Sequence, residues 1–366
     1  MAKWLKVSAL TILTLIVVVL LILGGYVIYL CAQYYRIADH QQLEIANAQT
    51  ELVQTNTNYT ISTYNIGFGA YTQDFSFFMD SGTMKDGTKT SGSGSKAKDK
   101  QTVIDNTNGS INSVKTGNFD FMLFQEVDTN STRSYGVNQY TLLNESFTEY
   151  SNSFAVNFHS GYLFYPILDP HGASNAGIAT YSKYKVDNAE RRSFPIDEGF
   201  FARFFDLDRC FSVNRLPIEN SNKELVLINL HMSAYDEGGV IRAKQLEMLN
   251  EILKAESDAG NYVIAGGDFN HDIANSKNLF PTQQEVPVWV AQLQNSDLAE
   301  NYSLVGATNA PTCRSTDMAY QKGVNYSSVI DGFIVSSNIT VVNNYNIDTD
   351  FKYSDHNPAV MEFKLN

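Results

Sequence analysis

The chain has 366 residues, 43% of them hydrophobic, and carries a formal net charge of −13 at pH 7. A chain of this length can bury one large core and still hold appendages. The acidic balance excludes a general electrostatic attraction to nucleic acid or anionic lipid, although a bound divalent cation would still let a phosphate substrate approach. Three cysteines exclude a disulfide-rich scaffold. They leave Cys210 and Cys313 either as a pair in an oxidising exterior or as two buried thiols.

The N-terminal region holds an uncharged apolar stretch at residues 7–30. At about 1.5 Å per helical residue, this stretch is long enough to cross a hydrocarbon core of roughly 30 Å. Lys3 and Lys6 precede it, so the positive-inside rule places residues 1–6 in the cytoplasm and the chain after residue 30 outside. A cleaved signal peptide, the rival interpretation, needs a shorter apolar region followed by small residues, which Leu30 and Cys31 do not provide. We therefore predict a single-pass cell-membrane protein, held in the lipid bilayer by an uncleaved signal anchor.

Two polar segments follow the anchor at residues 31–58 and 81–100. The first has only a short helical pattern around residues 41–52, and we interpret it as a stalk that leads to a domain at residues 59–366. The second is rich in Gly, Ser, Lys and Thr, which predicts a flexible insertion. Because it closely follows Asn65, we expect it on the side of the functional site. Its lysines could guide an anionic substrate, although a solvated insertion without a role is the more ordinary interpretation.

The remaining chain alternates short apolar runs with amphipathic stretches. The runs predict strands at residues 60–64, 119–124, 225–230, 262–265, 328–330 and 359–363. The amphipathic spacing predicts helices at residues 101–115 and 239–255. Strand, helix, strand order with several β-rich stretches indicates sheet layers covered by helices, an α/β fold.

Each predicted strand borders a polar cluster: Asn65, Gln125-Glu126, His231, Gly267-Asp268-Phe269-Asn270, Asp331 and Ser354-Asp355-His356-Asn357-Pro358. Strands of one sheet would bring such ends together, and the sites of open α/β sheets gather there. The set is rich in carboxylates and carboxamides, with two histidines and no thiols. These ligands suit a hard cation, so we predict a Mg²⁺ site, with Mn²⁺ as the second candidate.

Two of these clusters indicate specific chemistry. After the turn that the glycines allow, Asp268 could orient and deprotonate water, while Asn270 could donate to a phosphate oxygen. Asp331 could hold the imidazole of His356 in one tautomer and favour its charged form. The ordinary alternatives are an Asx turn for the first cluster and a surface hydrogen bond for the second. We favour the catalytic interpretation over these alternatives because candidate groups recur at several strand ends along the chain.

Together these residues resemble the endonuclease/exonuclease/phosphatase superfamily. The matching segments are Tyr64-Asn65-Ile66, Gln125-Glu126-Val127, Asn229-Leu230-His231, Gly267-Asp268-Phe269-Asn270, Ile330-Asp331-Gly332 and Ser354-Asp355-His356. The resemblance covers residues 59–366. It implies a DNase I-like four-layer α/β/β/α sandwich, here preceded by one transmembrane helix, and Mg²⁺-dependent cleavage of a phosphoester bond.

The resemblance also implies a role for each residue. Asn65, Glu126 and Asp355 would lie at the metal, with Glu126 as its main ligand. Asp268 would activate the attacking water with help from Asn270. His356, paired with Asp331, would contact or protonate the phosphate, and His231 would flank it from the other side. Two weaker candidates, Asn157 and Asn175, would face the substrate. Four arginines could contact its phosphate, although each could equally form a structural ion pair: Arg133, Arg203, Arg209 and Arg242.

The leading hypothesis is an extracytoplasmic, membrane-anchored, metal-dependent hydrolase. Phosphodiesterase, nuclease and lipid or sugar phosphatase all stay open, with nucleic acid, phospholipid or sugar phosphate as the substrate. The alternatives are a non-catalytic surface-binding module that retains the fold and a structural anchor that only docks a partner. The complete motif set favours the enzyme, and no protein partner is evident from the sequence.

Overall fold

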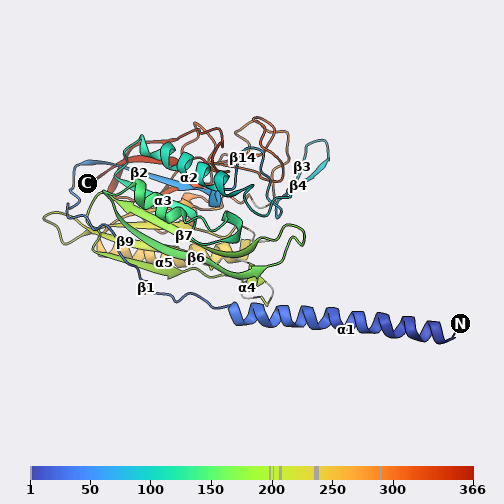
Figure 1. Ribbon diagram of the computed structural model, residues 1–366. Coiled ribbons are helices and arrows are strands. Elements are labelled where there is room, and N and C mark those ends of the chain that lie inside the picture. The colour runs from blue at the N-terminus through green and yellow to red at the C-terminus, as the bar shows by residue number, and fades with distance from the viewer. Residues whose placement is uncertain (1, 198, 201, 206–207, 235–238, 289) are drawn as a thin grey trace.

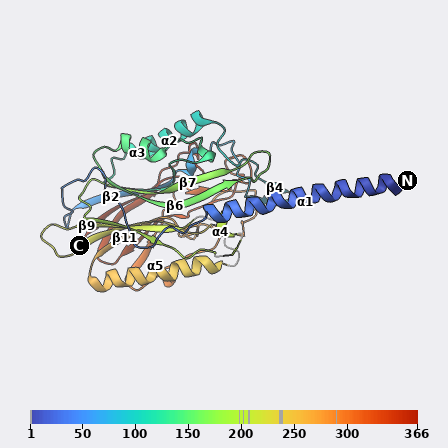
Figure 2. The same ribbon diagram turned by 60° about the horizontal axis from the view of Figure 1, so that its bottom comes forward.

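The computed structural model of the protein describes residues 2–197, 199–200, 202–205, 208–234, 239–288 and 290–366. Two β-sheets lie face to face. Helices α2 (Lys100–Lys115) and α3 (Gln139–Ser146) cover the outer face of one sheet, and α5 (Val240–Ala259) covers the outer face of the other (Figure 1, Figure 2). This is the four-layer α/β/β/α arrangement that the resemblance predicts.

Strand pairing gives the two sheets different topologies. One has six strands in the order β16 (Ile339–Asn346), β17 (Ala359–Leu365), β2 (Asn58–Asn65), β5 (Phe121–Asp128), β7 (Gly172–Ser182) and β6 (Ser151–Leu163). The other has seven in the order β1 (Gln41–Gln42), β8 (Asn188–Ser193), β9 (Cys210–Pro217), β10 (Glu224–His231), β11 (Tyr262–Asp268), β15 (Asp331–Ser336) and β12 (Tyr302–Val305). Each sheet contains one central parallel pair, β2 with β5 and β10 with β11.

The central strands are apolar on both faces because each sheet is covered twice. Alternate residues of β10 show this clearly: Leu225 and Leu227 pack between the sheets, whereas Val226 and Ile228 pack toward α5. In the other sheet, the inner layer receives Phe121 and Leu123 of β5, while the layer under α2 and α3 receives Met122 and Phe124. This double burial explains why the predicted strands appear as continuous apolar runs.

Both covering helices predicted from sequence are present, and local chemistry sets their ends. The side chain of Asp99 accepts from the amide of Thr102 at 2.8 Å and begins α2. Gly260, with φ of 74°, ends α5 and donates back to the carbonyls of Glu256 and Ser257. The N-terminal helix α1 (Ala2–Gln33) projects away from the domain (Figure 1). Its residues Lys6–Gln33 are long and apolar enough to cross a membrane.

The smaller elements lie mainly around one end of the sandwich. They are the strands β3 (Ser81–Thr83), β4 (Lys89–Ser91), β13 (Cys313–Arg314) and β14 (Ser327–Ser328), the short helix α4 (Ala202–Phe205), and the 3₁₀ turns η1 (Gly67–Gly69), η2 (Thr132–Ser134) and η4 (Asn295–Asp297).

The segment interpreted as a stalk needs a correction. Residues 41–52 form no helix; Gln41 and Gln42 pair with β8, and Ala46 pairs with Asn152. The alternating side chains of Leu43 and Ile45 pack against the core between the sheets. An apolar spacing of two residues is the strand period, so this part of the chain lies along the domain instead of standing off it.

Three further expectations differ from the structure. Residues 81–91 form the β3–β4 hairpin, which the hydroxyl of Thr90 fixes to Asp317, in place of a loop without secondary structure. Cys210 and Cys313 are both buried free thiols, so the pairing that the sequence left open is not formed. Asp331 begins β15 instead of following a strand at residues 328–330, because its backbone pairs with β11.

Candidate active site

Strand register brings the predicted polar residues to one edge of the sandwich. In the parallel pair β10–β11, His231 lies opposite Asp268, and in the antiparallel pair β11–β15 Asp268 lies opposite Asp331. In the other sheet Asn65 ends β2 beside Gln125 of β5. Because the sheets stack, both sets of strand ends meet.

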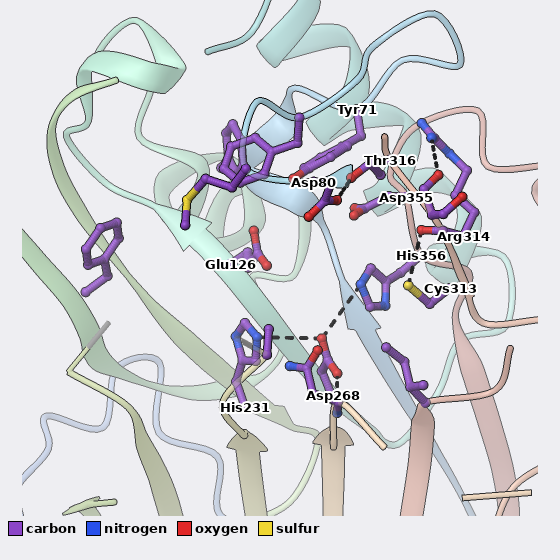
Figure 3. Close-up of a pocket in the computed structure, with 18 of the residues that line it drawn as sticks. Tyr71, Asp80, Glu126, His231, Asp268, Cys313, Arg314, Thr316, Asp355 and His356 are labelled. Atoms are coloured by element: carbon purple, nitrogen blue, oxygen red, sulfur yellow. Dashed lines mark hydrogen bonds and ion pairs between the residues drawn. The ribbon is translucent and has the colours of Figure 1, made fainter. Parts of the chain in front are cut away.

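These ends surround a cavity of about 290 Å³. Figure 3 shows Asp268 between the imidazoles of His231 and His356, with the carboxylates of Glu126 and Asp355 across the cavity from it. One side of the wall is apolar and aromatic. It is formed by Phe68, Tyr71, Phe77, Met79 and Phe158.

A bulge in β5 directs Glu126 toward the cavity. The pairing of β5 with β7 shifts register between Phe124 and Val127, and Glu126 itself has φ of 54°, in the left-handed region. Such a bulge re-aims a side chain that the regular pleat would place elsewhere. The amide Nδ2 of Asn65 then donates to Glu126 Oε1 at 3.1 Å and to Asp268 Oδ2 at 3.0 Å. Asn65 therefore joins the carboxylates of the two sheets.

The turn after β11 fixes Asp268 and Asn270. The backbone amide of Asn270 donates to Asp268 Oδ1 at 2.8 Å, while its side-chain amide donates to the carbonyl of Met232 at 2.8 Å. A Cβ atom at Gly267, which has φ of 151°, would lie 2.0 Å from the carbonyl oxygen of Leu230. Only glycine allows this approach of the two strands, so Gly267 sets how closely Asp268 approaches His231.

His356 and Asp331 form a buried pair. Nδ1 of His356 lies 2.8 Å from Asp331 Oδ2, and the ring's Nε2 lies 3.7 Å from Asp268 Oδ2. Burial alone would lower the pKa of the imidazole, but the negative charges of the carboxylates around it, Asp331 foremost, with Asp268 and Asp355, raise it well above the usual value. The pair therefore favours an imidazolium that points at Asp268.

His231 has the opposite environment. Its Nε2 lies 3.6 Å from the same oxygen of Asp268, but its buried Nδ1 has no hydrogen-bond partner among the described residues. Burial and the positive charges of Arg209 and His356 lower its pKa well below the usual value. Asp268 itself has a pKa raised to about 6 by burial and by the charge of Asp331. A base with a pKa near neutrality is suited to taking a proton from water.

The carboxylates of Glu126 and Asp355 fit a hard cation. Neither forms an ion pair with any described residue, and burial, together with the charge of Glu126, raises the pKa of Asp355 to about 7. The positive charges of His356 and Arg314 oppose this rise without cancelling it, so a Mg²⁺ ion would supply the compensation that is still missing. Atoms of Asp268, Asp331 and His356 also lie within 4.8 Å of one another, but the His356–Asp331 hydrogen bond already occupies that group.

Several motif residues hold the site without facing it. Gln125 donates to Thr63 and, at 2.8 Å, to Asn229 in the facing sheet, so these buried amides fix the spacing of the layers. The hydroxyl of Ser354 donates to the carbonyl of Asn65 at 2.8 Å and places the following Asp355 and His356. The motif therefore includes supporting residues as well as candidate reacting groups.

The endonuclease/exonuclease/phosphatase family profile matches residues 63–356, most of the chain. The protein belongs to this family. Similar solved structures include the family member from Beutenbergia cavernae, with 16% identity, a TM-score of 0.57 and coverage of 84% of this chain and 72% of that one. D. rerio TDP2, complexed with a single-strand DNA product, has 13% identity, a TM-score of 0.52 and coverage of 84% and 100%.

A third similar structure is ANGEL2, a 2′,3′-cyclic phosphatase in complex with adenosine-2′,3′-vanadate. It has 14% identity, a TM-score of 0.53 and coverage of 90% of this chain and 99% of that one. None of the curated proteins compared has a significant match to the sequence. At these identities the likeness establishes the DNase I-like fold, and membership of the endonuclease/exonuclease/phosphatase family establishes a phosphoester-hydrolase lineage.

The two asparagines predicted to face a substrate lie outside the set that lines the cavity. Asn157 is buried at a bulge of β6 beside Phe158, which does line it, and neither polar atom of its amide has a partner among the described residues. Asn175, half-buried on β7, serves the fold through its backbone, which accepts from Thr129 and donates to Ser131. The structure therefore does not bring either one to the wall of the site.

The four candidate arginines differ in the contacts that their guanidinium groups make with described residues. Arg133 pairs with Asp128 at 2.8 Å, and Arg242 donates to the carbonyl of Asn270 at 3.3 Å. Arg203 stacks on Phe204 outside the cavity wall. Arg209 lines the cavity, is only 3% exposed, and its Nε and Nη1 have no hydrogen-bond partner among the described residues. A buried guanidinium with two donors that no described residue accepts is a candidate oxyanion ligand.

Sequence reasoning missed Arg314, Asp80 and Thr316, which also line the cavity. Arg314 comes directly after Cys313, which pairs with His356, and its amide donates to the carbonyl of Asp355 at 3.0 Å. Asp80 accepts from the hydroxyl of Thr316. Arg314 lies on the short strand β13, and Asp80 and Thr316 lie on loops. None of the three belongs to a motif, so only the folded chain brings them to the site.

Proposed function

We propose that this protein is a membrane-anchored, divalent-metal-dependent hydrolase of a phosphoester, with its catalytic domain outside the cytoplasm and Mg²⁺ or Mn²⁺ as cofactor. The observation that carries the proposal is the placement of one carboxylate, Asp268, between two histidines whose pKa values are displaced in opposite directions. Groups whose surroundings separate their pKa values are typical of acid–base catalysis.

In the proposed mechanism, Asp268 orients a water and takes its proton as the water attacks phosphorus. Asn270 holds Asp268 through its backbone amide and offers its side chain to the phosphoryl group. His356 enters as an imidazolium held by Asp331, which lets it donate a proton to a phosphoryl or leaving oxygen. His231, neutral, donates a hydrogen bond from the opposite side. After the products leave, Asp268 releases to solvent the proton that it took from the water, and His356 takes one up from solvent.

Glu126 and Asp355 would hold the metal through their carboxylates, and Asn65, whose Nδ2 donates to Glu126 and whose Oδ1 accepts from the amide of Gly67, would position Glu126 instead of binding the ion. A bound Mg²⁺ or Mn²⁺ would supply positive charge to the equatorial oxygens that gain negative charge in the transition state. Arg209 adds a fixed positive charge on the side of His231, where its Nε and Nη1, which no described residue accepts, can bind a phosphoryl oxygen. Most of the catalysis is then positioning and charge stabilisation, as phosphoryl transfer requires.

The proposed location rests on the apolar helix and on Lys3 and Lys6 ahead of it. Protease added to intact cells is expected to release a fragment that contains the catalytic domain. Protection of that domain until the cells are lysed would contradict the extracytoplasmic location without affecting the enzyme proposal.

The enzyme proposal is tested with the full-length protein in nanodiscs. Wild-type protein is expected to hydrolyse bis(p-nitrophenyl) phosphate or a natural phosphoester with Mg²⁺ or Mn²⁺, to lose that activity in excess chelator, and to regain it when metal is restored. Asp268→Asn should hydrolyse the same substrate about 10²- to 10⁴-fold more slowly under the same conditions. Tight binding of phosphoesters without turnover, equal in wild type and Asp268→Asn, would instead support the non-catalytic binding module.

A further inference from the structure

An exposed apolar loop joins β6 to β7 at the end of the sandwich where α1 leaves the domain (Figure 1, Figure 2). Four of its side chains are exposed: Phe164 by 57%, Tyr165 by 64%, Ile167 by 83% and Leu168 by 99%. Large apolar side chains gathered this way on a surface usually mark a contact with another apolar phase. We call these four residues the apolar loop.

The loop contacts α1 directly. The hydroxyl of Tyr26 lies 3.1 Å from the carbonyl oxygen of Tyr162 and 3.3 Å from the amide of Phe164, and the rings of Tyr26 and Phe164 are 5.3 Å apart. One turn further along α1, Tyr29 accepts from the amide of Tyr162 at 2.9 Å and Leu30 packs on Leu163. The position of the loop along α1 is therefore fixed near Tyr26.

The length of α1 indicates where the surface of the bilayer lies relative to the domain. If the span begins after Lys6, about 20 residues at ~1.5 Å each cross a ~30 Å hydrocarbon core and end at Tyr26. Tyr26 and Tyr29 then lie at the interface, where tyrosines of spanning helices are enriched. The α1–loop contacts place the apolar loop at the same depth, in the headgroup and acyl boundary.

The loop also borders the candidate active site. The ring of Tyr165 is 5.7 Å from that of Phe78. Phe78 in turn contacts the rings of Phe77, edge to face, and His171, two residues of the cavity wall. Exposed Met79 continues this apolar side of the wall. An unbroken apolar path thus leads from the predicted membrane interface to the mouth of the cavity.

Charge on the same side of the cavity suits a lipid surface. The chain carries −13 in total, yet residues 81–100 contain five lysines and two aspartates. Lys85, Lys89, Lys98 and Lys100 are exposed, while Lys96 is paired with Asp169 of the β6–β7 connection at 2.7 Å. Lysines close to a bilayer are attracted to lipid phosphates, each by a modest amount.

We infer that the apolar loop enters the outer leaflet beside α1, and that the substrate is the phosphoester of a membrane lipid headgroup presented at the cavity mouth. This inference rests on the proposed function for its substrate, whereas the membrane contact stands on the α1–loop geometry. A nucleic acid would instead require a basic, wetted surface where the apolar loop lies. The lipid is therefore the substrate that the observations favour.

Depth-dependent quenching tests the membrane contact. Full-length protein carrying Cys31→Ser receives a cysteine at Leu168 or, as the matched control, at exposed Val342 on the edge strand β16, and each is labelled with a small environment-sensitive fluorophore. In nanodiscs whose lipids carry a quencher near the headgroup, the probe at residue 168 should be quenched several-fold more than the probe at residue 342. Equal quenching at the two positions would overturn the inference.

Kinetics test the substrate. The double variant Ile167→Ser, Leu168→Ser should hydrolyse a phospholipid in the same bilayer at least about tenfold more slowly than wild type, and bis(p-nitrophenyl) phosphate at the wild-type rate. An unchanged rate on the lipid, or a clear preference for single-stranded nucleic acid in both proteins, would overturn the inference. Hydrolysis of no phosphoester by wild type would remove the proposed function, and the quenching result would still decide the membrane contact.

Discussion

Asp268 lies between two histidines that are almost equally far from it, 3.6 Å for His231 and 3.7 Å for His356, yet their charges differ. His356 has a carboxylate, Asp331, at 2.8 Å behind its ring, and its pKa is raised. His231 has no carboxylate behind its ring and no hydrogen-bond partner for Nδ1 among the described residues, so burial, together with the positive charge of Arg209, lowers its pKa. The group behind each ring, and not its distance from Asp268, therefore decides which histidine can act as an acid.

We expect the largest losses of activity from variants that remove the charged group of His356 or of Asp268. His356→Gln and Asp268→Asn should each lower kcat by about 10² to 10⁴, with a smaller change in KM, because both groups act mainly on the transition state. His231→Gln, which removes one neutral hydrogen bond, should lower kcat by only about 10- to 100-fold. Steady-state kinetics with Mg²⁺, with melting temperatures close to wild type as the control, measures these effects. Equal losses for the two histidine variants would contradict the asymmetry.

Asp331→Asn sharpens the comparison by keeping the ring of His356 and removing the charge behind it. We expect kcat to fall by about 10- to 100-fold, less than for His356→Ala, because the imidazole remains but is less readily charged. The double variant Asp331→Asn, His356→Ala should be no worse than His356→Ala, since the pair acts as one unit. Additive losses in this cycle would show that Asp331 acts through another group.

On the side of Asp268 where His231 lies, Arg209→Met should raise KM roughly tenfold and lower kcat less, because it removes a proposed phosphate ligand and no proton donor. The same substitution at Arg192, which lies on the neighbouring strand and pairs with Asp39 outside the cavity, is the matched control. Arg209→Met should also raise the pKa of His231, because the positive charge of Arg209 is one cause of its depression. Identical kinetics for the two variants would exclude Arg209 from substrate binding.

Asp355→Asn tests the metal side of the cavity through stability. The metal-free folded protein keeps a proton on Asp355 up to a pKa of about 7, whereas the unfolded chain releases it near 3.8. Because the folded state binds more protons in this window, the contribution of Asp355 to stability is full below about pH 4 and is lost as the pH rises toward 7.

At pH 8 with chelator, Asp355→Asn should therefore melt at least about 2 °C above wild type, and near pH 4 the two should melt together. Added Mg²⁺ should raise the Tm of wild type and have much less effect on the variant. Asp258→Asn, on the exposed face of α5, is the control and should show neither effect. A Mg²⁺ response as large in Asp355→Asn as in wild type would remove Asp355 from the metal site.

Sequence was sufficient for the parts of the site that are local in the chain. The polar residues of each cluster follow or precede an apolar run, so their arrival at one edge follows from strand order and register alone. Apolar periodicity likewise predicted the helices α2 and α5 and sheets covered by helices, whereas the four-layer arrangement came from the family resemblance.

What sequence did not provide depends on contacts between distant segments. The bulge that turns Glu126 inward has no local signature. Arg209 resembles any strand-end arginine until the fold buries it with two donors that no described residue accepts. The polar composition of residues 31–58 suggested a stalk because the few apolar side chains that dock it, such as Leu43 and Ile45, are too sparse to stand out. The interface between α1 and the β6–β7 loop likewise joins residues more than 130 positions apart.

The charge difference between the two histidines is the central claim, and nitrogen NMR measures it most directly. Full-length protein labelled with ¹⁵N-histidine contains six such residues, and His356→Gln and His231→Gln assign the two that matter. In the metal-free protein we predict that both ring nitrogens of His356 carry protons between about pH 6 and pH 8, while His231 keeps one bare nitrogen throughout. If both rings instead titrate together near the ordinary histidine pKa of about 6.5, the assignment of one acid and one neutral donor around Asp268 is wrong.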